Sequence, residues 1–112
     1  MVYVTNEYLP GVRKIGVTND QKGFKKRMSF GQSFIPNEIK LYKGLRLKDL
    51  ETNMYVPDHI IENMMHKVFD EFRIKGCSAN ELFNCNEHII DTCISNLSND
   101  LKHDNYAIEI IN

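Results

Sequence analysis

The sequence predicts an α+β fold in which a β-hairpin comes first and helices flank a small, mixed or antiparallel, three-stranded sheet. Two observations support this prediction. Residues 1–5 and 12–18 are rich in β-branched and aromatic side chains, and Leu9-Pro10-Gly11 between them is a turn signal. Residues 57–72 and 86–97 then carry apolar side chains at helical spacing.

The segments between these elements complete the order. Asp20 is suited to cap a short helix over 21–29, because aspartate accepts hydrogen bonds from the first free amides of a helix. Residues 38–45 are typical of a third strand. Residues 46–56 are polar and are expected to form an insertion loop. We expect 98–112 to form a C-terminal tail or an edge strand.

Length and composition indicate one domain that spans 1–112. The hydrophobic fraction of 42% and the charged fraction of 26% are ordinary for a globular protein. No apolar run approaches the roughly 18 residues of a membrane span, and the first residues lack the pattern of a signal peptide. We therefore expect no membrane association and a cytoplasmic location, in the host cell if the source is viral.

Charge is distributed unevenly along the chain, although the formal net charge is only −1. Residues 1–48 carry ten Lys and Arg against three Asp and Glu, whereas 49–112 carry four against twelve. Such asymmetry predicts a basic face that attracts phosphates. The alternative is that the two halves interleave in space and the charges cancel.

Three cysteines, Cys77, Cys85 and Cys93, are an odd number and do not form a closed set of disulfides. We interpret them as reduced thiols in or near the core. A zinc site that includes His88 is the alternative, although the paired short spacings of structural zinc sites are missing.

Two segments of the basic half offer candidate chemistry. In the hairpin, Tyr3 and Lys14 are expected to project toward one region, where the cation would favour the phenolate form of the tyrosine. In the short helix, a group of basic side chains is suited to phosphate oxygens. This group consists of Lys22, Lys25, Lys26 and Arg27. The alternative for the hairpin is a half-buried tyrosine beside a solvated lysine, with no chemical role. The alternative for the short helix is a basic face that is simply solvated.

The long helix carries Glu62, His66, Phe69 and Arg73 at i, i+4, i+7 and i+11 spacing, so these residues share one side of it. That side borders the apolar stripe. A carboxylate, an imidazole and a guanidinium there are suited to hold a divalent metal and a phosphate. The alternative is a surface Glu–His pair of small energetic value.

Taken in order, these motifs resemble the GIY-YIG endonuclease superfamily. The motifs are VYV around Tyr3, KIG from Lys14 to Gly16, Arg27, the pattern E-x-x-x-H-x-x-F-x-x-x-R from Glu62, and ELF at 81–83. They are most similar to the branch from phages and large viruses, which has KIG as its second half-motif. The resemblance covers about residues 1–97 and implies a GIY-YIG-like fold.

The resemblance also implies roles for individual residues. Tyr3 would help to deprotonate the attacking water, with Lys14 in place of the second tyrosine of the family. Arg27 would stabilise charge on the phosphate, and Glu62 would hold one Mg²⁺ or Mn²⁺. Supporting positions are Gly16, His66 and Glu81, and Arg73 would join the basic residues in binding nucleic acid.

The predicted function is therefore metal-dependent hydrolysis of nucleic-acid phosphodiester bonds, with DNA as the favoured substrate. One alternative is a non-catalytic DNA-binding module on the same fold. Another is a phage protein-interaction factor that acts on a host protein. A homodimer or a protein recruiter is the further partner that we expect.

Overall fold

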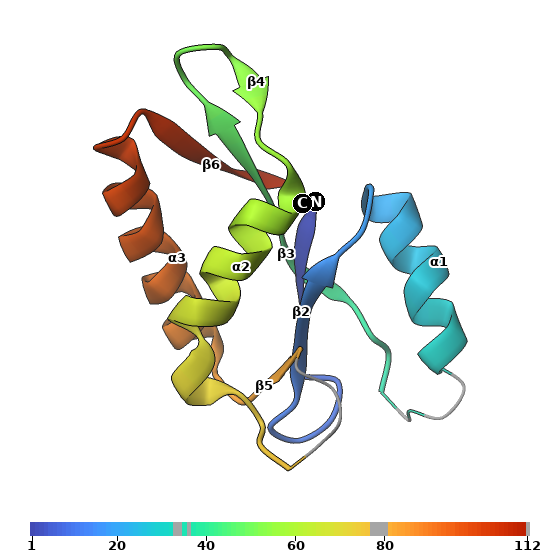
Figure 1. Cartoon of the computed structure of the whole chain (residues 1–112). Helices are drawn as coiled ribbons and strands as arrows, with labels where there is room; N and C mark the ends of the chain where they lie inside the picture. The colour runs from blue at the N-terminus through green and yellow to red at the C-terminus, as the bar shows by residue number, and fades with distance from the viewer. Residues whose placement is uncertain (33–34, 36, 77–80, 112) are drawn as a thin grey trace.

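The computed structural model describes residues 1–32, 35, 37–76 and 81–111. Its regular elements are short strands interspersed with helices (Figure 1). In order they are β1 (Val2–Thr5), β2 (Arg13–Val17), α1 (Gln21–Gln32), β3 (Leu41–Asp49), β4 (Met54–Tyr55), α2 (Asp58–Val68), the 3₁₀ turn η1 (Asp70–Phe72), β5 (Leu82–Phe83), α3 (Glu87–Lys102) and β6 (Tyr106–Ile111).

The strands form one sheet in the order β4-β3-β1-β2-β5, with β6 also paired to β3, and every pairing is antiparallel. The α+β class and the initial β1–β2 hairpin are thus confirmed. The sheet is larger than the predicted three strands: six strands are found among the described residues.

Helices cover both faces of the sheet. Helix α1 lies on one face, and α2 and α3 lie on the other (Figure 1). Strand alternation separates two cores accordingly. The larger core packs residues such as Val4, Ile15 and Leu45 against α2 and α3, and the smaller core packs Tyr3 against Phe24 of α1 and its neighbours. The smaller core fixes the position of Tyr3, one of the candidate site residues.

Capping side chains start two of the helices. The Asp20 Oδ1 atom accepts a hydrogen bond from the Gly23 amide at 2.7 Å, so the predicted cap of α1 is confirmed. The Asn86 Oδ1 atom accepts from the Ile89 amide at 2.9 Å and begins α3 in the same way. Pro57 occupies the position just before α2.

The expected insertion loop at 46–56 is wrong. Strand β3 continues to Asp49, and the chain returns as β4, with Asn53 at a φ of 60° in the tight turn between them. The extension is stabilised from a distance, since β6 pairs with β3 from Gly44 to Asp49. The polar residues of 46–56 therefore suggested a loop, whereas pairing with the distant strand β6 makes 46–49 part of β3.

Three helix ends also differ from the predictions, and the first is that α1 continues to Gln32 rather than ending at residue 29. Helix α2 ends at Val68 rather than near residue 72, and the 3₁₀ turn η1 follows. The reason is that the Phe72 carbonyl accepts a hydrogen bond from the Asn84 amide at 2.7 Å, which draws the chain toward β5. Helix α3 extends to Lys102, and of the expected tail only β6 forms the edge strand.

The cysteine interpretation holds for the two described cysteines. Cys85 and Cys93 are free thiols that belong to or pack against the larger core. Burial raises the pKa of Cys85 to about 11, so the thiol is protonated at neutral pH. Cys77, which the zinc alternative includes, lies outside the described residues. None of the described helices has the length and apolar character that a membrane crossing requires.

Candidate active site

The site is built on the β1–β2 hairpin. Tyr3 lies opposite Gly16 in the antiparallel register. Lys14 is two residues before Gly16 on β2, so its side chain lies on the same face of the sheet as that of Tyr3. The hairpin is closed beyond this pair by the Lys14 amide, which donates to the Thr5 hydroxyl at 2.8 Å. The shared face predicted for Tyr3 and Lys14 is therefore confirmed.

Gly16 leaves space that the Tyr3 side chain occupies. A Cβ atom on Gly16 would lie 2.6 Å from the Tyr3 Oη atom and 2.8 Å from Cζ. The other side of the ring packs edge-on against Phe24 of α1, with 5.1 Å between the ring centroids. Tyr3 is fully buried, so its hydroxyl has one fixed position.

Three charged side chains from separate elements influence the pKa of this hydroxyl. Arg27 of α1 lowers the pKa of Tyr3, and Glu81 and Glu62 raise it. Burial is the largest influence, and the net result is a pKa of about 12. The cation that favours the Tyr3 phenolate is Arg27 and not Lys14 as expected, and burial outweighs it, so the hydroxyl keeps its proton at neutral pH.

The Lys14 ammonium pairs with a carboxylate and does not act on Tyr3. Its Nζ atom lies 3.5 Å from the Glu81 Oε2 atom in an ion pair. The pairing of β2 with β5 brings these residues together, since Lys14 lies opposite Leu82 and the Ile15 amide donates to the Glu81 carbonyl at 3.0 Å. Lys14 also lowers the pKa of Tyr8, which burial raises.

Tyr8 is a further residue close to Tyr3 and Lys14, and it was not among the residues predicted from the sequence. It is buried, and its hydroxyl interacts electrostatically with both Lys14 and Tyr3. It lies in the connection between β1 and β2, where no strand pattern marks it. Its aromatic character so close to a turn was the one available signal.

Arg27 is exposed on α1, and one of its nitrogens is anchored. The Nη1 atom donates to the Val17 carbonyl at the end of β2 at 2.6 Å. The anchor holds the guanidinium over the hairpin, and its other N–H groups remain for a ligand. Lys22, Lys25 and Lys26 are also exposed on α1.

The α2 candidates differ in their surroundings. Glu62 is partly buried and, within the described part of the chain, has no hydrogen bond or ion pair. The His66 Nε2 atom lies 3.2 Å from the Ile15 carbonyl, which ties α2 to β2. Arg73 donates to the His66 carbonyl, pairs with Asp70 at 3.6 Å and stacks on Phe83. His66 and Arg73 thus have structural contacts, whereas the Glu62 carboxylate is available to a ligand.

The buried hydroxyl of Tyr3 makes stability depend on alkaline pH. The folded-state pKa of about 12 exceeds the ordinary value of 10.0, so the unfolded chain loses its proton first. Stability from this group is complete below pH 10 and is lost as the pH rises toward 12. Between pH 9 and 11 the free energy of unfolding of the wild type should fall, and we expect this fall to be smaller by roughly 1 kcal/mol in Tyr3→Phe. Urea unfolding of both proteins at each pH measures this, and equal losses would contradict it.

The chain belongs to the T5orf172 domain family, whose model matches residues 1–98, from β1 into α3. The T5orf172 domain is phage-associated and related to GIY-YIG and HNH-like endonuclease families. Family membership is consistent with interaction with nucleic acid. Comparison with curated proteins and with solved structures found no match.

Proposed function

We propose that the protein is an endonuclease of GIY-YIG type that hydrolyses phosphodiester bonds of nucleic acid, with DNA as the substrate. The observation that carries the proposal is that Arg27, Glu62 and Glu81 lie on three elements that meet at the Tyr3 hairpin. Arg27 is held at the Val17 carbonyl, Glu81 pairs with Lys14, and α2, which carries Glu62, is tied to β2 through His66. All three charges influence the pKa of Tyr3. These side chains come from α1, α2 and the residue before β5, which are far apart in the sequence. A guanidinium, a carboxylate and a fixed hydroxyl in one place suit a reaction in which charge develops on a phosphate.

Glu62 fits the requirements of a single divalent cation. No cluster of three or more His, Cys, Asp or Glu that could hold a metal exists among the described residues. Mg²⁺ is often held by one or two carboxylates, with water and substrate phosphate as its other ligands. A partly exposed carboxylate without a protein partner matches that pattern. Mg²⁺ or Mn²⁺ on Glu62 would supply Lewis-acid stabilisation of the phosphate.

The protein residues then have distinct roles. Arg27, anchored by the Val17 carbonyl, would bind the non-bridging oxygens of the scissile phosphate. The neutral Tyr3 hydroxyl would orient the water whose oxygen attacks phosphorus as the bond to the leaving ester oxygen breaks. The Glu81 carboxylate, paired with Lys14, would accept the proton that this water loses as its oxygen bonds to phosphorus, and the leaving oxygen would take a proton from solvent.

One observation favours a second function, a non-catalytic DNA-binding module on this fold. Lys14 stands where many GIY-YIG nucleases, which the sequence resembles, have a tyrosine, and its ammonium pairs with Glu81 instead of activating Tyr3. A protein that retained Arg27 and the basic face without an active hydroxyl would bind phosphates and leave them intact.

A cleavage assay over a panel of DNA and RNA structures, with Mg²⁺ or Mn²⁺, separates the two functions. The panel should include duplexes, single strands and branched molecules, because the fold sets no preference among them. We expect metal-dependent cleavage of at least one DNA structure. Binding without cleavage under both metals would contradict the enzyme and support the binding module.

Arg27 gives a second test of the proposed site. Arg27→Gln is expected to lower the cleavage rate by about tenfold or more, because the forked contact with phosphate oxygens is lost. Arg27→Lys should recover little of this, since a lysine ammonium cannot form the same planar contact. Single-turnover rates measure the effect. Lys102→Ala on α3, on the opposite face of the sheet, is the control, and an equal loss there would contradict the role of Arg27.

A further inference from the structure

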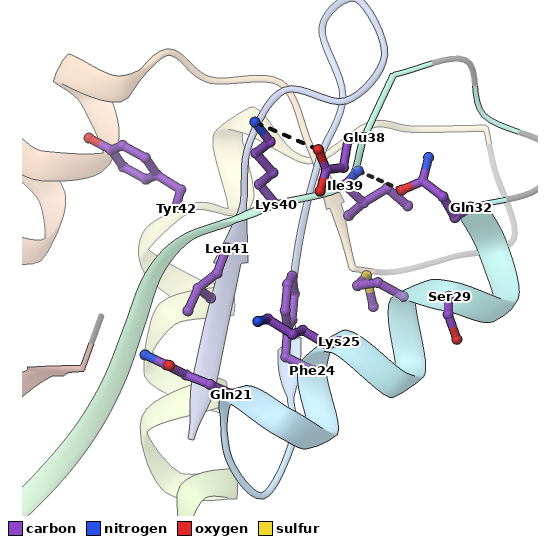
Figure 2. A pocket seen from close by; sticks show the side chains of 11 residues that line it. Gln21, Phe24, Lys25, Ser29, Gln32, Glu38, Ile39, Lys40, Leu41 and Tyr42 are labelled. Atoms are coloured by element: carbon purple, nitrogen blue, oxygen red, sulfur yellow. Dashed lines mark hydrogen bonds and ion pairs between the residues drawn. The ribbon is translucent and has the colours of Figure 1, made fainter.

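A groove runs along the side of α1 that faces β3 and the segment before it. Its volume is about 650 Å³. Figure 2 shows Phe24, Ile39 and Leu41 at its floor, with Gln21 and Lys25 of α1 at its margin. The position of residue 39 is fixed by its amide, which donates to the Gln32 Oε1 atom at 2.7 Å. The groove is therefore a built feature with an apolar floor and a polar margin.

A second hollow of about 620 Å³ continues the groove at the start of α1. The two share Gln21 and Lys25, and the second adds Lys22 and Arg46. Arg46 is fixed there because its Nη2 atom donates to the Asn19 carbonyl at 2.8 Å. Together the two hollows form one track, which we call the α1–β3 track.

Beyond Arg46, the track reaches an exposed aromatic ring. The Arg46 Cζ atom and the Lys48 Nζ atom each lie 5.5 Å from the centroid of the Tyr55 ring. Tyr55 is 50% exposed, and its hydroxyl donates to the Glu109 Oε1 atom at 3.2 Å. A tethered aromatic ring flanked by two cations is suited to stack a base and to contact the phosphate beside it.

The charges of the track favour a polyanion. Of its acidic residues, Glu38 pairs with Lys40 at 3.7 Å, and Asp20 caps α1. Glu109 lies opposite Arg46 and accepts the hydrogen bond of Tyr55, and these three carboxylates are outnumbered by Lys22, Lys25, Lys40, Arg46 and Lys48. Lys22, Lys25 and Arg46 have no ion-pair partner within the described ranges. The uncompensated charge along the track is therefore positive.

The track is separate from the candidate active site. Lys25 and Arg27 are two positions apart on α1, which places them roughly 160° apart around the helix axis. Arg27 accordingly reaches β2, and Lys25 lines the groove beside β3. Phe24 lies between the two, with its ring against Tyr3. A ligand in the track would pass the far side of α1 from the hydroxyl of Tyr3.

We propose that the α1–β3 track binds an unpaired strand of nucleic acid that adjoins the cleaved duplex. This inference rests on the proposed function and adds a substrate class, a duplex with a single-stranded tail or flap. Apolar floors and exposed rings bind bases only when the bases are unpaired, because a duplex hides their faces. Lys22, Lys25 and Arg46 hold the phosphates, and Leu41 and Tyr55 contact bases.

Binding of fluorescent DNA tests the inference. One ligand is a blunt duplex, and the other is the same duplex with a tail of about ten nucleotides, within the range that single-strand-binding surfaces cover. We expect wild-type protein to bind the tailed duplex more tightly. Tyr55→Ala should weaken that complex by about fivefold or more, Tyr55→Phe should retain it, and affinity for the blunt duplex should stay within about twofold. Arg46→Glu should weaken the tailed complex and reduce its salt dependence by about one unit of log–log slope.

The controls separate this inference from the proposed function. Lys102→Glu makes the same change of charge on the opposite face of the sheet and should leave both complexes intact. Equal affinity of wild-type protein for the two ligands, or equal effects of Tyr55→Ala on both, would contradict single-strand binding by the track. The proposed cleavage activity would be unaffected by either result. Failure to bind either ligand would overturn both proposals.

Discussion

Glu62→Gln is expected to lower the cleavage rate by at least about 10²-fold and to change the affinity for nucleic acid by less than about twofold. The reason is that a metal ligand acts mainly in the transition state, whereas the exposed basic residues bind phosphates in the ground state. Glutamine has nearly the shape of glutamate, and Glu62 has no hydrogen bond or ion pair within the described ranges. The variant should therefore fold as the wild type does.

Measurement requires single-turnover cleavage and equilibrium binding with the same DNA. Calorimetry with Mg²⁺ or Mn²⁺ should detect an ion on the wild-type complex and none on the variant. Glu71→Gln is a matched control, since Glu71 is exposed in η1 and is not among the charges that act on Tyr3. Equal residual cleavage by wild type and Glu62→Gln would point to a contaminating nuclease and would contradict the role of Glu62.

Local sequence rules predicted the parts of the fold that local interactions determine. The two short strands around Leu9-Pro10-Gly11 formed a hairpin, and Gly11 has the positive φ of 72° that the turn requires. The aspartate at position 20 caps α1. In each case the residues that direct the structure are neighbours in the sequence.

Elements that depend on distant partners were predicted less well. Leu45 and Leu47 alternate with Arg46 and Lys48, which is a strand pattern, yet the polar residues suggested a loop. The partner that completes this strand, β6, begins only at Tyr106. In the basic half of the chain Arg13 is buried, whereas the cations of α1, which are Lys22, Lys25, Lys26 and Arg27, are exposed. Their division between the two sides of α1 became visible only once the helix was placed on the sheet.

The candidate site shows the same limit. The sequence motifs indicate Tyr3, Lys14 and Glu81, but spacing along the chain does not determine the partner of each charge. The cation that acts on Tyr3 is Arg27, and Lys14 pairs with Glu81. Side-chain partners depend on the final geometry of β2, β5 and α1, which no spacing within one segment encodes.

Gly16→Ala is expected to disable the site without touching any of its charges. The added Cβ atom would lie 2.6 Å from the Tyr3 Oη atom and 2.8 Å from Cζ, closer than side chains tolerate. The ring is fully buried against Phe24 and cannot move away freely. We expect a loss of about 1–3 kcal/mol in the free energy of unfolding, as for other overpacked cores. Displacement of the Tyr3 hydroxyl should also lower the cleavage rate by about 10²-fold.

The double variant Tyr3→Phe/Gly16→Ala tests whether the Tyr3 hydroxyl causes the strain. Removal of the Oη atom eliminates the closest contact, but the contact with Cζ remains, so part of the lost stability should return. Cleavage should stay low in the double variant, because the hydroxyl itself is gone. Urea unfolding and single-turnover rates of the two single variants and the double variant complete the cycle. Wild-type stability and activity in Gly16→Ala would show that Tyr3 is not held where the structure has it, and the role of its hydroxyl in orienting water would be lost.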